Sequence, residues 1–168
     1  SDEGAALAER IGSLEAATGY TAVEGPGLVV VLDSADGSDP AATDDPGRVL
    51  DTDVQNAVNA LWASGAEAIA VNGVRLTSTT AIRSAGAAIL VDFRPLLPPY
   101  RVEAIGDGAA LAVEFPRTTS GRELDDVVQQ FGVKLSFEQA TSLTLPASTA
   151  LLPVRARVPS LATDTVAG

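Results

Sequence analysis

The chain has 168 residues, of which 46% are hydrophobic and only 4% aromatic, so we expect one domain of ordinary size with an aliphatic core. It contains neither His nor Cys, which excludes the usual general base, the common zinc sites, disulfides and thiolate chemistry. The net charge of −11 argues against nucleic-acid binding, because phosphate backbones would be repelled. We therefore expect a binding or structural module that is not an enzyme and that holds neither a cofactor nor a metal.

The first predicted element is a helix over residues 5–18. Leu7, Ile11 and Leu14 follow the 4–3 spacing of a coiled-coil seam, but the seam is too short to be stable alone. We expect residues 1–19 to be the end of a longer stalk, with a homodimer through this stalk as one expectation. A helix that packs on its own domain is the alternative. The first residue is not Met, and we expect any membrane contact to come only from a missing N-terminal helix.

A buried strand is predicted next. Residues 28–32, LVVVL, form a continuous β-branched run, which is typical of a central strand that is buried on both faces. Residues 33–48 then hold Asp, Gly, Ser and Pro without apolar periodicity, so we predict an exposed, mobile loop. Asp33, Asp36 and Asp39 are spaced by three, unlike the alternating acids of a calcium loop, and we interpret the segment as a solvated acidic loop.

The clearest helix pattern spans residues 52–64. Thr52 and Gln55 have the spacing of a capping box, and Gly65 is expected to end the helix in a left-handed conformation. Apolar residues recur on one face as far as Leu61 and Trp62. The pattern predicts that Trp62 is a core side chain, and that Trp62→Ala costs about 3–5 kcal/mol.

Short strands and two more helices follow. Asn72 and Gly73 form a turn signal, and Gly106–Gly108 starts a helix that runs to Phe115. Ser120 and Glu123 have the capping-box spacing for another helix, which Gly132 ends. The predicted strands are 66–71, 75–77, 81–84, 88–91, 100–105 and 133–143.

This order of elements predicts an α+β fold. We expect a two-layer α/β sandwich of the ferredoxin-like type, the alpha-beta plait, with an antiparallel hairpin insertion. Residues 20–146 would form this single domain, and residues 147–168 an extended or disordered tail. The alternative is a three-layer doubly wound sheet, for which too few helices are available.

The segment from Asn72 to Tyr100 is the strongest candidate for a site. Arg75 and Arg83 flank a run of hydroxyl side chains, and guanidinium and hydroxyl groups can together hold an anion or a carboxylate. The alternative is that the arginines brace turns by bonding backbone carbonyls or by pairing with Glu67 and Glu103. The candidate binding residues are Asn72, Arg75, Thr77, Ser78 and Arg83.

Three stretches of the sequence resemble a known family: VEGPGLVVVLD, LWASGAEAIAVNGVRLTSTTAIR and PPYRVEAIGD. They are similar to the bacterial YlxW/YlxX-like family, a domain of unknown function (eight-eight-one), in the style of its actinobacterial members. The resemblance covers about residues 5–146. It implies a short coiled coil, a single-pass anchor in the cell membrane, a domain on the extracytoplasmic side and an association with cell division. It implies no catalytic residues.

Two functions are therefore expected from the sequence. The first is a non-enzymatic, extracytoplasmic interaction module with protein partners in the cell envelope. The second is an anion or small-ligand sensor that uses the segment containing Arg75 and Arg83. Neither involves nucleic acid.

Overall fold

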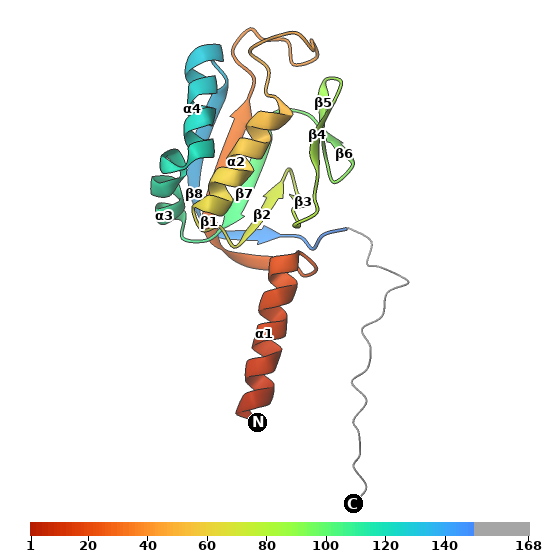
Figure 1. Cartoon of the computed structure of the whole chain (residues 1–168), viewed down its shortest axis with the longest axis vertical. Helices are drawn as coiled ribbons and strands as arrows, with labels where there is room; N and C mark the ends of the chain where they lie inside the picture. Colours follow the sequence, from red (N-terminus) through yellow and green to blue (C-terminus); the bar gives the residue numbers. More distant parts are fainter. Residues whose placement is uncertain (150–168) are drawn as a thin grey trace, which may run out of the picture.

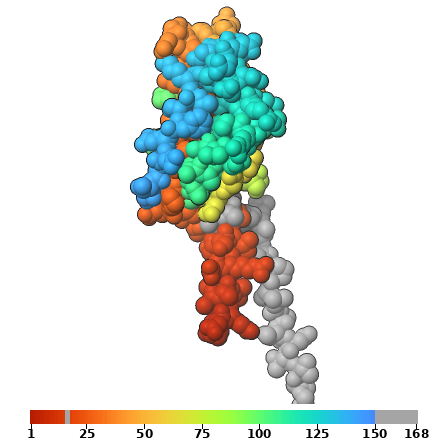
Figure 2. Space-filling view, turned by 90° about the vertical axis from the view of Figure 1, so that its left-hand side faces the viewer, coloured from red at the N-terminus to blue at the C-terminus, as the bar shows by residue number. Residues whose placement is uncertain are grey.

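The first helix projects from the body of the protein. The computed structural model describes residues 1–149, and α1 spans Asp2–Thr18 (Figures 1 and 2). All side chains from Ser1 to Glu15 are exposed. The helix predicted over residues 5–18 is confirmed. Most of the predicted tail, residues 150–168, lies outside the described residues.

A five-stranded antiparallel sheet forms the centre of the domain. Its strands are β1 (Val23–Asp33), β2 (Ala68–Val71), β3 (Val74–Arg75), β7 (Tyr100–Ile105) and β8 (Lys134–Leu145). Their order is β3-β2-β7-β1-β8, so β1 is paired on both sides. Val30, for example, lies opposite Val102 of β7 and Phe137 of β8. The run LVVVL is thus an interior strand, as predicted.

Three α-helices cover one face of this sheet (Figure 1). They are α2 (Asp51–Ala63), α3 (Gly108–Glu114) and α4 (Thr119–Phe131), and a short 3-10 helix, η1 (Phe115–Arg117), joins the last two. The core lies between the layers, where Leu28 and Leu32 of β1 share one cluster with Leu61 of α2 and Leu124 of α4. The α+β prediction is confirmed, and its ferredoxin-like detail stays a prediction. Within residues 1–149 no helix covers the opposite face, which removes the support for a three-layer sheet.

The opposite face is covered by the ends of β1 and β8. The pairing of these strands is irregular between Gly25 and Gly27, where their two-stranded ribbon changes direction (Figure 1). Leu143 and Leu145 of the ribbon form a second apolar cluster with residues of the main sheet such as Val29. At this irregularity β1 approaches β7 closely, because a Cβ on Gly27 would lie 1.9 Å from the Ala104 carbonyl oxygen.

A second, smaller sheet is inserted between β3 and β7. Its antiparallel strands are β4 (Ile82–Ala85), β5 (Ala88–Val91) and β6 (Arg94–Leu96), in the order β4-β5-β6. Ile89 and Val91 of β5 pack into the main core. This is the predicted antiparallel insertion, with three strands instead of the two of a hairpin.

Both capping boxes were predicted at the wrong residues. Helix α2 begins at Asp51, and the Asp53 carboxylate accepts a 2.8 Å hydrogen bond from the Leu50 N–H, while the Gln55 side chain bonds to β4 instead. Helix α4 begins at Thr119, where the Thr118 hydroxyl accepts from Gly121 N–H at 2.9 Å. The Thr52–Gln55 and Ser120–Glu123 pairs fit the spacing but lie inside helices that have already started.

The glycine helix ends are confirmed. Gly65 has a φ of +100°, and the N–H groups of Gly65 and Ala66 donate to the carbonyls of Trp62 and Leu61 at 3.1 and 3.0 Å. These are the two hydrogen bonds of a Schellman motif. Gly132 ends α4 in the left-handed conformation.

The acidic segment between β1 and α2 is a loop, as predicted, and it is braced by one carboxylate. Asp45 accepts hydrogen bonds of 2.8 Å from the N–H groups of both Asp39 and Gly47. These bonds hold the pKa of Asp45 below its ordinary value. A backbone bond from Ala35 to Gly47 closes the base of the loop.

The predicted single-pass membrane anchor is wrong for the part of the chain that the structure describes. Among residues 1–149, no helix combines the length and the apolar character that a membrane crossing requires. Helix α1 has 17 residues, and Asp2, Glu3, Glu9, Arg10 and Glu15 are distributed along it.

Candidate functional site

Arg75 is buried and connects distant backbone segments through hydrogen bonds. Its side chain is only 2% exposed, and Nη1 donates to the carbonyl of Thr21 at 2.8 Å and to that of Pro146 at 3.1 Å. It thereby joins β3 to the segments that precede β1 and follow β8. Burial lowers the pKa of Arg75. The alternative interpretation from the sequence, an arginine that bonds backbone carbonyls, describes this residue.

Asn72 also braces the backbone. It stands at a φ of +45° in the turn between β2 and β3. Its Oδ1 accepts from the Arg101 N–H at 2.6 Å, and its Nδ2 donates to the Pro99 carbonyl at 3.4 Å. Arg83 lies apart from it, exposed on β4 opposite Leu90. The five predicted site residues are therefore not gathered at one place.

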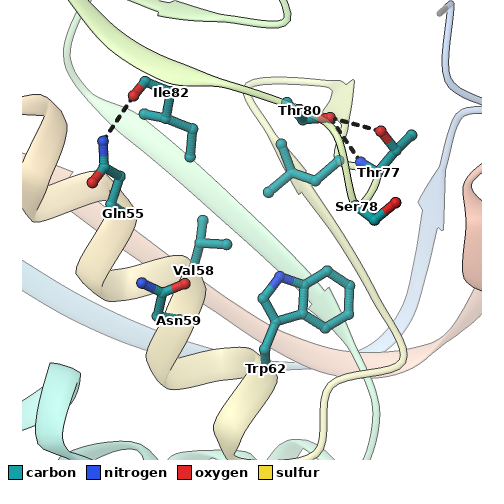
Figure 3. Close-up of a pocket in the computed structure, with 9 residues that line it drawn as sticks. Gln55, Val58, Asn59, Trp62, Thr77, Ser78, Thr80 and Ile82 are labelled. Carbon is teal, nitrogen blue, oxygen red and sulfur yellow. Dashed lines mark hydrogen bonds between the residues drawn. The ribbon is translucent and has the colours of Figure 1, made fainter.

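Thr77 and Ser78 do lie together, on the wall of a groove of about 340 Å³ between α2 and the segment that leads into β4 (Figure 3). None of the described residues that line it is charged, and neither Arg75 nor Arg83 takes part. We call it the Trp62 groove. Its lining residues are Gln55, Val58, Asn59, Trp62, Leu76, Thr77, Ser78, Thr80 and Ile82.

The prediction that Trp62 is a core residue is wrong. The Trp62 side chain is 39% exposed and lies along the groove (Figure 3). Successive helix residues are about 100° apart, and Leu61 already points into the core, where it is fully buried. Trp62 stands at the edge of the apolar face of α2, and the groove is the space beside that edge.

Hydrogen bonds fix the two walls of the groove. Gln55 Nε2 donates to the Ile82 carbonyl at 2.7 Å and so ties α2 to β4 (Figure 3). On the other wall, Thr77 N–H donates to Thr80 Oγ1 at 2.8 Å, which fixes the turn. The run of hydroxyl side chains is thus a turn that is stabilised by hydrogen bonds among its own residues.

Two polar side chains of the groove are available to a ligand. Asn59 and Ser78 are exposed, and among the described residues neither side chain has a hydrogen-bond partner. An amide and a hydroxyl can each donate and accept. With Trp62 between them, the groove offers one aromatic surface and two neutral polar groups. None of the lining residues in the described part of the chain titrates near neutral pH.

Sequence reasoning missed the helix side of this site. Gln55, Asn59 and Trp62 recur at i, i+4 and i+7, which places them on one stripe of α2. The sequence signal that could have indicated this site is a tryptophan at the edge of an apolar face, beside two amide side chains. The ambiguity arises because the apolar face of α2 includes five residues, and periodicity alone does not say which edge the sheet covers.

The chain belongs to a family of bacterial proteins of unknown function, DUF881, which it matches over residues 10–156. The predicted resemblance to the YlxW-like family is thereby confirmed. It is 37% identical over 153 residues to the UPF0749 protein Rv1823 of Mycobacterium tuberculosis, covering 86% of this chain and 50% of that protein. It is 36% identical over 89 residues to the UPF0749 protein YlxW of Bacillus subtilis, covering 53% of this chain and 38% of that protein.

The fold is also found in a solved structure. The crystal structure of an uncharacterized conserved protein from Mycobacterium tuberculosis matches with a TM-score of 0.72 and 27% identity, covering 89% of this chain and 99% of that one. The present chain spans about half the length of the curated mycobacterial relatives that it matches.

Proposed function

We propose that this chain is a non-catalytic interaction module that takes up an uncharged segment of a protein partner in the Trp62 groove. The observation that carries the proposal is the 39% exposure of Trp62, the single Trp of the chain, on the wall of a groove whose lining residues within 1–149 are all neutral. Tryptophan is enriched among the residues that contribute most to protein–protein binding.

The polar groups of the groove suit a polypeptide backbone. Each peptide unit carries one donor and one acceptor, and the free amide of Asn59 can meet both. The Ser78 hydroxyl, on the opposite wall, supplies a second contact. Because no charged side chain of the described residues lines the groove, binding an uncharged segment would require no ionic group of this lining to lose its water.

The alternative, an anion sensor built on Arg75 and Arg83, has less support. The Arg75 guanidinium is buried against the carbonyls of Thr21 and Pro146, and Arg83 stands on a different strand. The net charge of −11 would also repel an anion at long range.

A displayed library of uncharged peptides, selected on the immobilised chain, tests the proposal. Selected peptides should alter the Trp62 fluorescence, and Trp62→Ala should weaken their binding about 30-fold, which is the effect of a typical hot-spot residue. Phe131→Ala is the matched control, because Phe131 is an aromatic residue with 40% exposure that lies outside the groove. It should leave the affinity unchanged.

Loss of folding must be separated from loss of binding. Because the indole is only partly buried, Trp62→Ala should cost about 1–2 kcal/mol in free energy of unfolding, which leaves the domain folded. Peptides that bind equally well to the Trp62→Ala variant would contradict the groove as the binding site. Turnover of a substrate by the purified protein, abolished by one substitution, would contradict the non-catalytic assignment.

A further inference from the structure

Helix α1 carries an apolar stripe that nothing in the described structure covers. Leu7, Ile11 and Leu14 are 60%, 48% and 59% exposed, on a helix that stands away from the body (Figures 1 and 2). Isolated helices of this length are marginal in water, and most helices are stabilised by packing of their apolar face. The alternative of a helix packed on its own domain is not what the structure shows.

The spacing of the stripe defines a seven-residue repeat. With Leu7 and Leu14 at position d, Ile11 falls at position a, and Gly4 and Thr18 take the flanking a positions. A β-branched residue at a combined with leucine at d favours two parallel strands. The sequence of the stripe thus matches a second copy of the same helix.

The charges beside the stripe fit the same arrangement. Arg10 occupies position g and Glu15 the following position e, which face each other across a parallel, in-register dimer. By two-fold symmetry this pair occurs twice. The preceding g–e pair consists of Glu3 and Ala8, so the arrangement opposes no like charges.

We propose that two copies of this chain associate through α1 as a parallel, in-register coiled coil in which Arg10 of each copy faces Glu15 of the other. An antiparallel pair sets a positions against d positions. Either Leu14 would then face Gly4 or Leu7 would face Thr18. Only the parallel alignment opposes each of the three apolar residues to an apolar residue. The proposal is independent of the Trp62 groove, which lies on the domain.

Sedimentation equilibrium of the full chain over a wide range of concentrations tests the association. The wild type should show a reversible monomer–dimer equilibrium, and Ile11→Lys should weaken it about 100-fold or more, because two charges would enter the seam. Arg10→Glu should weaken it about threefold to tenfold through two like-charge contacts. Arg10→Glu combined with Glu15→Arg restores opposite charges and should restore the wild-type affinity.

Cysteine cross-linking determines the orientation, because the chain has no Cys of its own. In a parallel, in-register dimer position 11 faces position 11, so Ile11→Cys should form a disulfide-linked dimer rapidly on oxidation. Ser13→Cys is the matched control, since Ser13 is exposed on the same helix outside the a and d positions.

Each outcome decides the proposal. A wild-type chain that stays monomeric at every concentration overturns it, as does equal cross-linking of the two cysteine variants. Failure of the charge exchange to restore affinity overturns the assigned register. Because α1 lies outside the core, the urea unfolding transition of the domain should be the same in every variant, so a lost dimer cannot be attributed to misfolding.

Discussion

At the scale of single residues, buried polar side chains hold parts of this domain together by hydrogen bonds to the backbone. Arg75 and Asp53 are 2% and 3% exposed, and each bonds backbone groups. A buried polar group is tolerated only when such bonds replace its water. Composition and spacing marked Arg75 as a candidate ligand residue, but its partners are 54 and 71 residues away along the chain. No local pattern carries that information.

The contribution of Arg75 to stability can be tested by comparing its alanine variant with that of Arg83. Arg75→Ala should lower the free energy of unfolding by about 2–4 kcal/mol, because the carbonyls of Thr21 and Pro146 lose a charged donor in a buried place. Arg83→Ala, at an exposed position, should change it by no more than about 0.5 kcal/mol. Urea unfolding measures both. Equal effects would show that the hydrogen bonds of Arg75 contribute little to the free energy of unfolding.

Asp53 should make stability depend on pH. Burial raises its pKa above the ordinary value of 3.8, and the charge of Asp51 raises it further. The folded state then binds the proton more tightly than the unfolded state. This contribution to stability is lost as the pH rises from about 3.8 through the folded pKa.

Asp53→Asn isolates that contribution, because an amide oxygen can still accept from the Leu50 N–H. The free energy of unfolding of the wild type, relative to this variant, should fall as the pH rises through the same window. Urea unfolding at a series of pH values measures the difference. A difference that is constant with pH, or that rises, would contradict the raised pKa.

At the scale of elements, helix ends, strand cores and the start of α3 were predictable, and the starts of α2 and α4 were not. Gly65 and Gly132 could be assigned because only glycine readily takes the left-handed conformation that ends a helix. The N-cap pattern needs only a hydroxyl and an acid or amide three residues apart, so it occurs by chance in polar helix surfaces. Thr118, the observed N-cap of α4, precedes the predicted Ser120 by two residues.

The close pairing of β1 with β7 should depend on Gly27. A Cβ at this position would meet the Ala104 carbonyl oxygen at 1.9 Å, so Gly27→Ala must push β1 away from β7. We expect a loss of about 3 kcal/mol or more in free energy of unfolding. Gly12→Ala is the control, because no atom lies within 4 Å of a Cβ there and α1 is outside the core. Urea unfolding compares the two, and a small loss at Gly27 would show that the ribbon can shift at little cost.

At the scale of the whole molecule, the net charge should make thermal stability depend on ionic strength. The net charge of −11 makes the folded state repel itself, and salt screens that repulsion. Thermal unfolding followed by circular dichroism should therefore give a Tm that rises by a few degrees between low and moderate ionic strength. The response should be smaller after Asp125→Asn and Asp126→Asn, two exposed positions of α4. A Tm that falls with salt would show that favourable ion pairs outweigh the repulsion.

The sequence by itself determined the α+β class, the interior strand Leu28–Leu32, the helices and their glycine ends, and the family. The structural features follow from side-chain periodicity and backbone preferences, which act over a few residues, and the family follows from the resemblance of three stretches of the sequence. Only the tertiary structure decided that Trp62 borders a groove, that Arg75 fastens three segments and that the β1–β8 ribbon covers the second face of the sheet. Each of these depends on which distant segments come into contact, and packing settles that only when the whole core forms.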